Sequence, residues 1–336
     1  MEENVSKLTS RKRRRFQDLA EQAGLPESAT LANQLLMLMD GAWVGARIFG
    51  KANPAADLAP AARSLIERMM TDDNSRLRGI FDQAAALYDQ ARPGYPDALF
   101  DDVVALSGIP RGGRILEVGC GTGQATVPFA RRGYRILAVE LGANLATVAR
   151  HKLAAYSGAE VQVGSFEDWS VEAGGFDLLI SATAFHWIDP AIRYRKAARA
   201  LKPGGTIALF WNHHVWNEAS GSFFDEVQEF YLRAGEAKAR EYQGLPLPDD
   251  LPTTVRDEID ATGLFGEVSI RQYLWNQEYD AVSYINVLNT YSNHRDLPDD
   301  KREQLFRDIS EVIGTRYGGR IVKGYSTQLY VAHRSV

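Results

Sequence analysis

Residues 115–126 read "ILEVGCGTGQAT", an apolar run that passes directly into a glycine-rich turn. Gly119, Gly121 and Gly123 alternate with other residues there, and the acidic Glu117 lies just before them. This pattern predicts a buried strand, a tight turn and the start of a helix. Because several nucleotide-binding folds share such a turn, the glycines alone do not identify the ligand.

The spacing of the glycines separates this turn from two common phosphate-binding loops. A dinucleotide fingerprint requires G-x-G-x-x-G, whereas this turn reads G-x-G-x-G and is followed by Gln124. No Lys followed by Ser or Thr completes a phosphate loop. Glu117 would repel a pyrophosphate but attract an ammonium or sulfonium group. Glu140, which ends the next predicted strand, could accept hydrogen bonds from both hydroxyls of a ribose. S-adenosyl-L-methionine has a ribose and a positive charge but no phosphate, and it fits these residues.

The composition is ordinary for a globular protein: 336 residues, 45% of them hydrophobic, with a formal net charge of -5. This balance gives no electrostatic reason to expect nucleic acid or an anionic membrane as a partner. The single cysteine excludes an internal disulfide, so we expect a cytoplasmic protein. The most apolar long stretch, residues 31–50, is interrupted by Asp40 and Arg47, which argues against a membrane span. We expect no metal site.

From residue 80 onward, predicted strands alternate with helix-sized segments, which indicates an α/β fold with a doubly wound, mostly parallel sheet. The predicted strands are "RILEVG", "YRILAVE", "AEVQVGSF", "FDLLISAT", "GTIALFWN", "EVSIRQYLW" and "STQLYVAHR". The last two are longer and alternate more openly, so we expect them to pair antiparallel at an edge of the sheet. Helical insertions at about 217–243 and 279–316 are expected to build a lid or a substrate pocket.

Six segments in this order resemble a class I S-adenosylmethionine-dependent methyltransferase, of the methyltransferase type 11 group that includes trans-aconitate methyltransferase-like enzymes. They are "FDQAAALYDQARPGYP", "ILEVGCGTGQAT", "LAVELGANL", "GSFEDW", "FDLLISATAFHWID" and "ALKPGGTIALFWN". The resemblance covers residues 76–336. It implies a seven-stranded Rossmann-like sheet and an enzyme that moves a methyl group to a small-molecule acceptor by in-line displacement.

The resemblance also implies roles for single residues. Glu117 and the three glycines of the turn would line the methionine part of the cofactor, and Glu140 would hold its ribose. Many members carry Asp where this chain has Ser165, so backbone contacts would have to hold the adenine there. The remaining cofactor positions would be Leu141, Ser165, Phe166, Ser181 and Arg92.

Methyl transfer from a sulfonium needs alignment and exclusion of water more than a particular catalytic group. After the fourth predicted strand, His186 could accept a proton from the acceptor, and Trp187 could offer an apolar face. Arg92 or Tyr88, in the segment before the sheet, could close the site over the cofactor. A structural role is the alternative for each: a loop hydrogen bond for His186 and packing for the others.

The acceptor is left open by the sequence, as is the choice of oxygen, nitrogen or carbon as the methylated atom. Aromatic residues after the fifth strand and in the second insertion favour an apolar or aromatic molecule, whereas the trans-aconitate resemblance favours a carboxylate. His213 and His214 follow the fifth strand as further acid–base candidates. Cys120 has no base nearby in the sequence and is interpreted as a small residue in a tight turn. The aromatic residues are Trp211, Trp216, Phe223, Phe224, Tyr231, Tyr284 and Tyr291.

Residues 1–75 form a predicted helical module. Within it, "RFQDLAEQAGLPESATLANQLLMLMDGAWVGARIFG" and "LAPAARSLIERM" resemble the C-terminal helices of TetR-family regulators, which form a dimer interface in that family. No helix-turn-helix accompanies them, and the basic run at residues 11–15 is interpreted as a solvated helix face. We therefore expect homodimerisation through these helices. The alternative function for the whole chain is a non-catalytic regulatory protein that binds S-adenosylmethionine or another ligand.

Overall fold

The computed structural model describes residues 2–22, 25, 27–49, 57–66, 82 and 85–335, and it divides the chain into two units, Met1–Leu77 and Arg78–Val336. The boundary falls two residues after the predicted position. Helices α1 (Glu2–Gln22) and α2 (Ser28–Phe49) pack against each other in the first unit, and residues 58–66 are also helical. The apolar spacing predicted this, because Leu31 and Leu36 of α2 are buried. The predicted linker at residues 71–79 lies outside the described residues.

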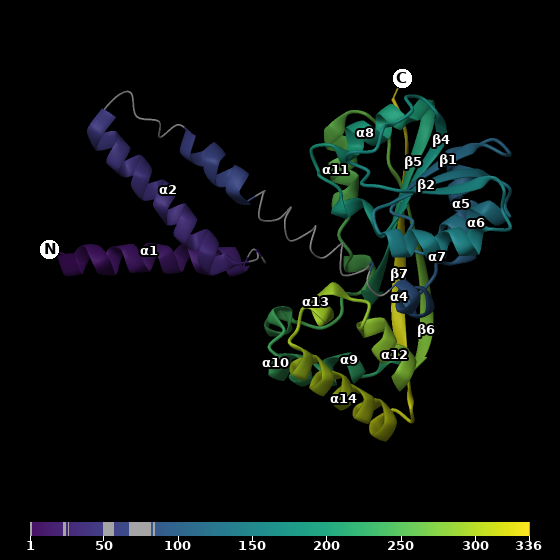
Figure 1. Cartoon of the computed structure of the whole chain (residues 1–336). Coiled ribbons are helices and arrows are strands. Elements are labelled where there is room, and N and C mark those ends of the chain that lie inside the picture. The colour runs from purple at the N-terminus through teal and green to yellow at the C-terminus, as the bar shows by residue number, and fades with distance from the viewer. Residues whose placement is uncertain are drawn as a thin grey trace. The chain divides into compact units, whose positions relative to one another are not determined.

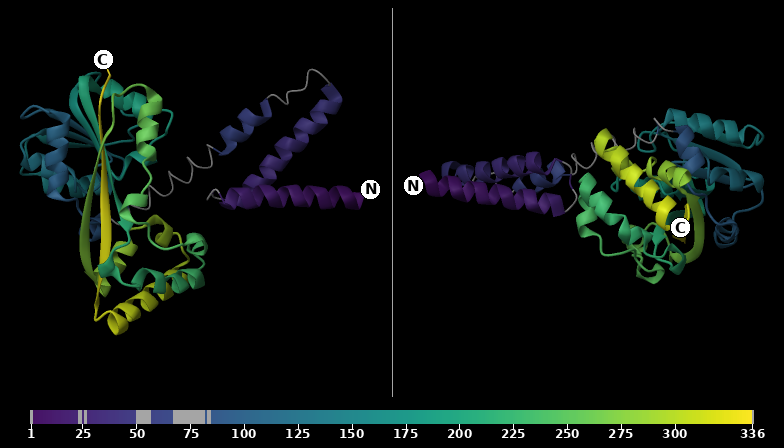
Figure 2. Two further views of the ribbon diagram at one scale, coloured as in Figure 1. Left: turned by 180° about the vertical axis from the view of Figure 1, so that it is seen from behind. Right: turned by 90° about the horizontal axis from the view of Figure 1, so that it is seen from below.

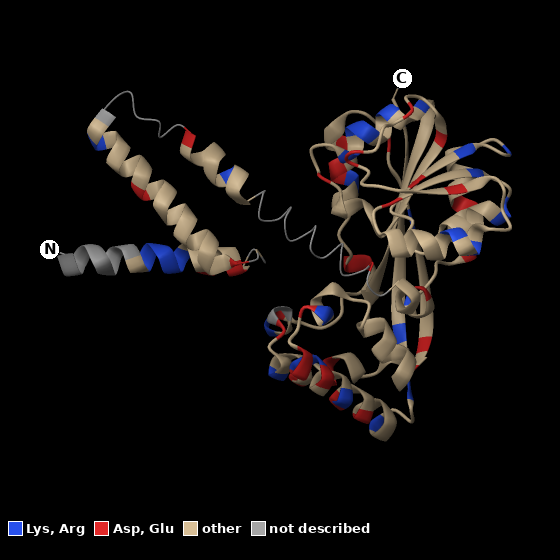
Figure 3. Ribbon diagram, viewed as in Figure 1, with Lys and Arg blue, Asp and Glu red and all other residues tan. Residues whose placement is uncertain are grey.

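The charged side chains of α1 support the interpretation of its basic run. Residues 11–15 are exposed, and Figure 3 shows them as one blue stretch along the helix. Within the described part of the chain, we find no helix with an apolar stretch long enough to span a membrane.

Seven strands form a single sheet in the second unit (Figure 1). They are β1 (Arg114–Val118), β2 (Arg135–Glu140), β3 (Ala159–Val163), β4 (Phe176–Ala182), β5 (Leu201–Val215), β6 (Ser269–Asp280) and β7 (Arg320–His333). Their order is β3-β2-β1-β4-β5-β7-β6. β1 to β5 are parallel, whereas β7 runs antiparallel to both β5 and β6. The predicted doubly wound, mostly parallel sheet with an antiparallel edge is confirmed.

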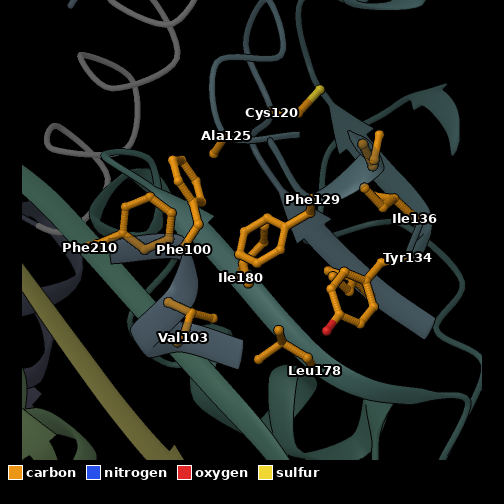
Figure 4. Packing of buried hydrophobic residues seen from close by; sticks show 14 of the residues in the cluster. Phe100, Val103, Cys120, Ala125, Phe129, Tyr134, Ile136, Leu178, Ile180 and Phe210 are labelled. Atoms are coloured by element: carbon orange, nitrogen blue, oxygen red, sulfur yellow. The ribbon is translucent and has the colours of Figure 1, made fainter. Parts of the chain in front are cut away.

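Helices cover both faces of the sheet because the strands of its centre are apolar on both sides. α5 (Asp97–Ser107), α6 (Thr126–Arg131) and α7 (Ala143–Leu153) pack on one face, and α8 (Arg193–Ala200) packs on the other with α11 (Thr254–Thr262) against it. Figure 4 shows the core of the first face, where the rings of Phe100 and Phe129 meet edge to face at 5.3 Å. The ring centre of Phe210 in β5 lies 6.5 Å from that of Phe100 in the same core.

The strands β5, β6 and β7 continue beyond the end of β4 and carry the helical insertions. β4 pairs with β5 only as far as Phe210, whereas β7 pairs with β5 out to Val215 and with β6 out to Asp280. Figure 2 shows this extension reaching the helices of both insertions, which share a separate apolar core with it. Both predicted insertions are present as α9 (Phe223–Glu226), α10 (Gln228–Ala234), α12 (Ala281–Leu288), α13 (Ser292–Arg295) and α14 (Asp299–Arg316).

Candidate active site

The glycine turn after β1 has a backbone conformation that residues other than glycine would strain. Gly119, Gly121 and Gly123 have φ angles of 71°, 56° and 87°, in the left-handed region that favours glycine. A Cβ atom on Gly119 would lie 2.5 Å from the Cβ of Ala184, so the turn also approaches the segment after β4 closely. A Cβ on Gly121 would make ordinary contacts with the side chains of Tyr88, at 3.8 Å, and Gln124, at 3.9 Å. The glycines therefore let the turn pass close to β4 and leave its backbone accessible.

Glu140, the last residue of β2, holds the glycine turn in place. One of its carboxylate oxygens accepts from the backbone N–H of Gly121 at 2.8 Å, and the other accepts from that of Gly142 at 2.9 Å. Burial raises the pKa of Glu140, although these two N–H groups act in the opposite direction. Since each carboxylate oxygen has a second lone pair, Glu140 can also accept from a ligand hydroxyl.

Glu117 in β1 is fully buried, and neither of its carboxylate oxygens makes a well-formed hydrogen bond with the described residues, although the hydroxyl of Thr126 is close enough to lower the pKa of Glu117 slightly. Burial raises its pKa from the ordinary value of 4.5 to about 8. A buried carboxyl group without a well-formed hydrogen bond is costly. An ammonium or another donor of a bound ligand would remove this cost, so the residue fits a cationic group beside the turn.

A cavity of about 290 Å³ opens beside the turn at the carboxyl ends of the strands, where open α/β sheets bind their ligands. It gathers most of the predicted site residues from five separate parts of the chain. Its wall includes the predicted residues Tyr88, Arg92, Gly119, Gly121, Glu140, Leu141, Ser165, Phe166, His186 and Trp187.

Three predicted cofactor residues, Glu117, Ser181 and Gly123, are not part of the cavity wall. Glu117 is buried in β1 behind the glycine turn. Ser181 is fully buried, and its hydroxyl donates to the backbone carbonyl of Val118 at 2.7 Å, so it joins β4 to β1 instead of facing the cavity. Thr183 faces the cavity in its place and has an unusual φ of 54°. A β-branched residue in this region stores backbone strain, which is common at functional sites. The Cβ position of Gly123 faces Ala149 of α7 at 3.7 Å and is not part of the cavity wall.

Ser165 and Phe166 line the cavity from the loop after β3. The hydroxyl of Ser165 donates to a carboxylate oxygen of Glu167 at 2.8 Å and accepts from the Glu167 N–H. Its side chain is therefore engaged within its own loop, and Phe166 is almost fully buried in the core. This arrangement leaves backbone groups of the loop for an adenine, as expected from the missing Asp.

His186 and Trp187 lie in a short 3-10 turn, Phe185–Trp187, at the cavity wall. The indole N–H of Trp211 donates to Nδ1 of His186 at 3.1 Å. A neutral imidazole that accepts at Nδ1 carries its proton on Nε2. The hydrogen bond from Trp211 is the kind of contact that the alternative role, orientation of the loop, requires, and the role of His186 as a proton acceptor stays a prediction.

The segment before the sheet reaches over the cavity through α4 (Ala85–Ala91) and Arg92. The Arg92 guanidinium donates to the carbonyl of Thr290 in the second insertion at 2.9 Å. It also lies over the rings of Tyr88, at 4.9 Å, and Tyr291, at 4.6 Å. Arg92 thus joins α4 to the second insertion across the site. Asp82 fastens the same segment to the start of α7, because its carboxylate accepts from the backbone N–H of Asn144 at 2.8 Å.

The second insertion, which was expected to form part of a lid or pocket, contributes to this cavity, but the sequence did not single out Ser292 or Asn293. Tyr291, Ser292 and Asn293 line the cavity, although they are remote from the glycine turn in the sequence. Only the size of the insertion and its aromatic content hinted at a role. Burial raises the pKa of the Cys120 thiol, which agrees with its interpretation as a packing residue. Among the described residues, no group of three His, Cys, Asp or Glu side chains could hold a metal ion.

The strand order, together with the glycine turn after β1 and the acid at the end of β2 beside one cavity, matches the Rossmann-like arrangement that the resemblance to class I methyltransferases implies. The comparisons with known proteins point to the same class. Residues 116–209 match the family model of a methyltransferase domain.

Similar proteins include bacterial methyltransferases. An uncharacterized methyltransferase of Mycobacterium tuberculosis is 29% identical over 207 residues, which cover 62% of this chain and 80% of that protein. The ubiquinone biosynthesis O-methyltransferase of Xanthomonas axonopodis pv. citri is 39% identical over 103 residues, which cover 30% of this chain and 43% of that protein. A solved structure assigned to a type II methyltransferase of Anaeromyxobacter dehalogenans shares the fold with a TM-score of 0.50 at 20% identity, covering 72% of this chain and 97% of that one. The present chain is a methyltransferase, and its cofactor is S-adenosyl-L-methionine.

Proposed function

We propose that the chain transfers a methyl group from S-adenosyl-L-methionine to a small-molecule acceptor, with the cofactor in the cavity beside the glycine turn. The fully buried carboxyl group of Glu117, which makes no well-formed hydrogen bond with the described residues, carries this proposal, because it calls for a donor or cation beside the turn. Glu140 adds two acceptor oxygens at the neighbouring strand end. A sulfonium cofactor with an ammonium and a ribose supplies groups for both residues.

The residues of this chain would hold the cofactor in three parts. Glu117 and the turn would bind the methionine end, and Glu140 would bind the ribose. The adenine would lie against Leu141, whose side chain is 44% exposed at the cavity, and against the backbone around Ser165. When bound, the cofactor supplies an electrophilic methyl group on a sulfonium.

The protein would contribute orientation and exclusion of water to the transfer. Arg92, anchored on Thr290, would hold the second insertion and α4 together over the reacting groups. His186 would fix the loop after β4 through Trp211, and a protonated acceptor would need a group that takes its proton. An acceptor that arrives without a proton to lose needs no such group.

Replacement of Glu140 tests the cofactor site. We expect Glu140→Ala to weaken binding of S-adenosylmethionine by more than tenfold in calorimetry, a loss of at least about 1.4 kcal/mol. Glu140→Gln, which keeps one acceptor oxygen, should fall between this variant and the wild type. Glu229→Ala, which removes an exposed carboxylate on α10, serves as the control. Unchanged affinity in a folded Glu140→Ala protein would refute the ribose assignment.

We further propose that the first unit forms a homodimer through α2. Met37, Val44 and Ile48 lie at positions i, i+7 and i+11 of this helix, which share one face, and their exposed fractions are 74%, 48% and 67%. An apolar face of this kind is stabilised by burial against a second copy. The resemblance to TetR-family helices, which pair in dimers, supports the same partner. The single buried cysteine supports a reducing location such as the cytoplasm.

A further inference from the structure

A second, inner cavity of about 140 Å³ adjoins the cofactor cavity. The two cavities share part of their walls, including Tyr88, Arg92, Gly121, Thr183 and Tyr291. The inner cavity continues toward the extended strands, so its far wall comes from β5 and β7. An acceptor in the inner cavity would therefore lie next to the cofactor.

Lys323 of β7 provides a buried positive charge in this far wall. Lys323 is only 4% exposed, and its ammonium group donates a hydrogen bond to the hydroxyl of Tyr291 at 3.0 Å. It also lies over the rings of Tyr291 and Tyr325, at 5.2 Å and 5.3 Å. Among the described residues, Lys323 makes no ion pair with a carboxylate. A buried ammonium without an opposite charge is unusual, because burial of a charge is costly unless it is paired.

The electrostatic effect of Lys323 is seen in its neighbours. Burial, together with the Lys323 charge, lowers the pKa of His214 to about 2, so this histidine is neutral. Burial alone would raise the pKa of Tyr291, but the charges of Lys323 and Arg92 outweigh it and the pKa is lowered. Glu236 lines a third cavity that Lys323 also borders, yet it does not pair with Lys323. The inner cavity is therefore electropositive.

Three further polar atoms in the same wall are buried and have no hydrogen-bond partner. They are Nε of Arg92, the side-chain nitrogen of Gln124 and Nε2 of His214. The first two are donors by their chemistry, and a neutral His214 can take either role. Buried polar groups are nearly always satisfied, so several orphans around one cavity indicate that a ligand satisfies them. That ligand must offer oxygen acceptors and a negative charge.

We propose that the inner cavity is the acceptor subsite and that it binds the carboxylate of a small organic acid through Lys323, Arg92 and Gln124. The tyrosines around it (Tyr88, Tyr95, Tyr291 and Tyr325) provide flat apolar walls for the remainder of the acid. A planar carboxylate can accept hydrogen bonds from the guanidinium of Arg92 and the amide N–H of Gln124, and its negative charge would pair with the ammonium of Lys323. This inference rests on the proposed function, because it places the acid beside the cofactor.

Matched aromatic probes test the inference on the full chain saturated with S-adenosylhomocysteine. Benzoate, benzamide, benzylamine and phenyl phosphate share a ring and differ in charge and shape. In calorimetry we expect benzoate to bind at least tenfold more tightly than the other three. In Lys323→Met this preference should fall to within about twofold, whereas Lys323→Arg should retain most of it. Lys301→Met, which removes an exposed lysine on α14, should behave as the wild type.

The affinity for S-adenosylhomocysteine reports separately on folding and on the proposed function. If every variant binds it normally but benzamide or benzylamine binds as well as benzoate, or the preference survives in Lys323→Met, the carboxylate subsite is wrong. Tighter binding of phenyl phosphate, or no binding of benzoate, overturns it equally. If the wild type does not bind S-adenosylhomocysteine, the proposed function itself fails and the inference fails with it.

Discussion

Two buried carboxyl groups, Glu117 and Glu140, differ in the hydrogen bonds that they accept. Glu140 has backbone N–H groups for both oxygens, whereas Glu117 has no well-formed hydrogen bond to either. The sequence predicted that both acids face the cofactor. It did not predict that one of them also fastens the glycine turn, because that depends on how close the ends of β1 and β2 lie.

The raised pKa of Glu117 predicts a pH dependence of stability. The folded state holds this proton up to pH about 8, while the unfolded chain releases it near pH 4.5. The group therefore stabilises the fold below pH 4.5, and its contribution is lost as the pH rises through about 8, at about 1.4 kcal/mol per pH unit in between. We expect cofactor-free Glu117→Gln to be more stable than the wild type at pH 8 and similar to it at pH 5.

Thermal unfolding across this pH range measures the difference. Glu229→Gln, which changes an exposed carboxyl on α10, should follow the wild type at each pH. Equal pH dependence in Glu117→Gln and the wild type would show that the buried carboxyl does not hold a proton. Glu117→Gln should also bind S-adenosylmethionine more weakly, because it lacks the negative charge.

At the scale of elements, the sequence predicted all seven strands, including the two antiparallel ones at the edge. Strand periodicity is a local property, and the apolar runs of β1 and β4 are long enough to be recognised as strands from the sequence. The length of β5 to β7 was less visible. β5 continues to Val215, three residues beyond the predicted end at Asn212, because β7 supplies hydrogen bonds that the local sequence does not reveal.

The glycine turn yields a prediction with a matched control. Gly119 and Gly133 both have left-handed φ angles, 71° and 81°, but only at Gly119 would a Cβ meet another atom, 2.5 Å from Ala184. Gly133→Ala should lose only the backbone cost of about 1–2 kcal/mol in stability. Gly119→Ala should lose more and also bind the cofactor at least tenfold more weakly. Chemical denaturation and calorimetry check both, and equal affinity in the two variants would contradict the role of the turn.

At the scale of the whole molecule, the chain consists of two units with separate interiors. The core clusters of the sheet and of the insertions contain residues of the second unit only. The cofactor cavity and the inner cavity are likewise lined by residues of the second unit. We propose that the first unit contributes to assembly through α2.

Sedimentation tests this division of roles. The full chain should sediment as a dimer at micromolar concentration, whereas residues 78–336 should be monomeric and bind S-adenosylmethionine with unchanged affinity. Val44→Glu together with Ile48→Glu should dissociate the full-length dimer, because both exposed side chains lie on the proposed interface. Asp18→Ala, which removes an exposed carboxylate on α1 away from this face, is the control. A monomeric wild type would contradict the dimer.

The residue pattern alone predicts the succession of strands along the α/β region, the turn after β1 and the acids in β1 and at the end of β2, since these follow from short-range periodicity and spacing. The order of the strands within the sheet comes from the tertiary structure. Only the tertiary structure decided which side chains meet across the cavity. Ser181 is buried instead of facing the ligand, and His186 is engaged by Trp211. Lys323, in the last strand, lines the same cavity as Arg92, which precedes the first strand. Such contacts join residues far apart in the chain, and no local pattern encodes them.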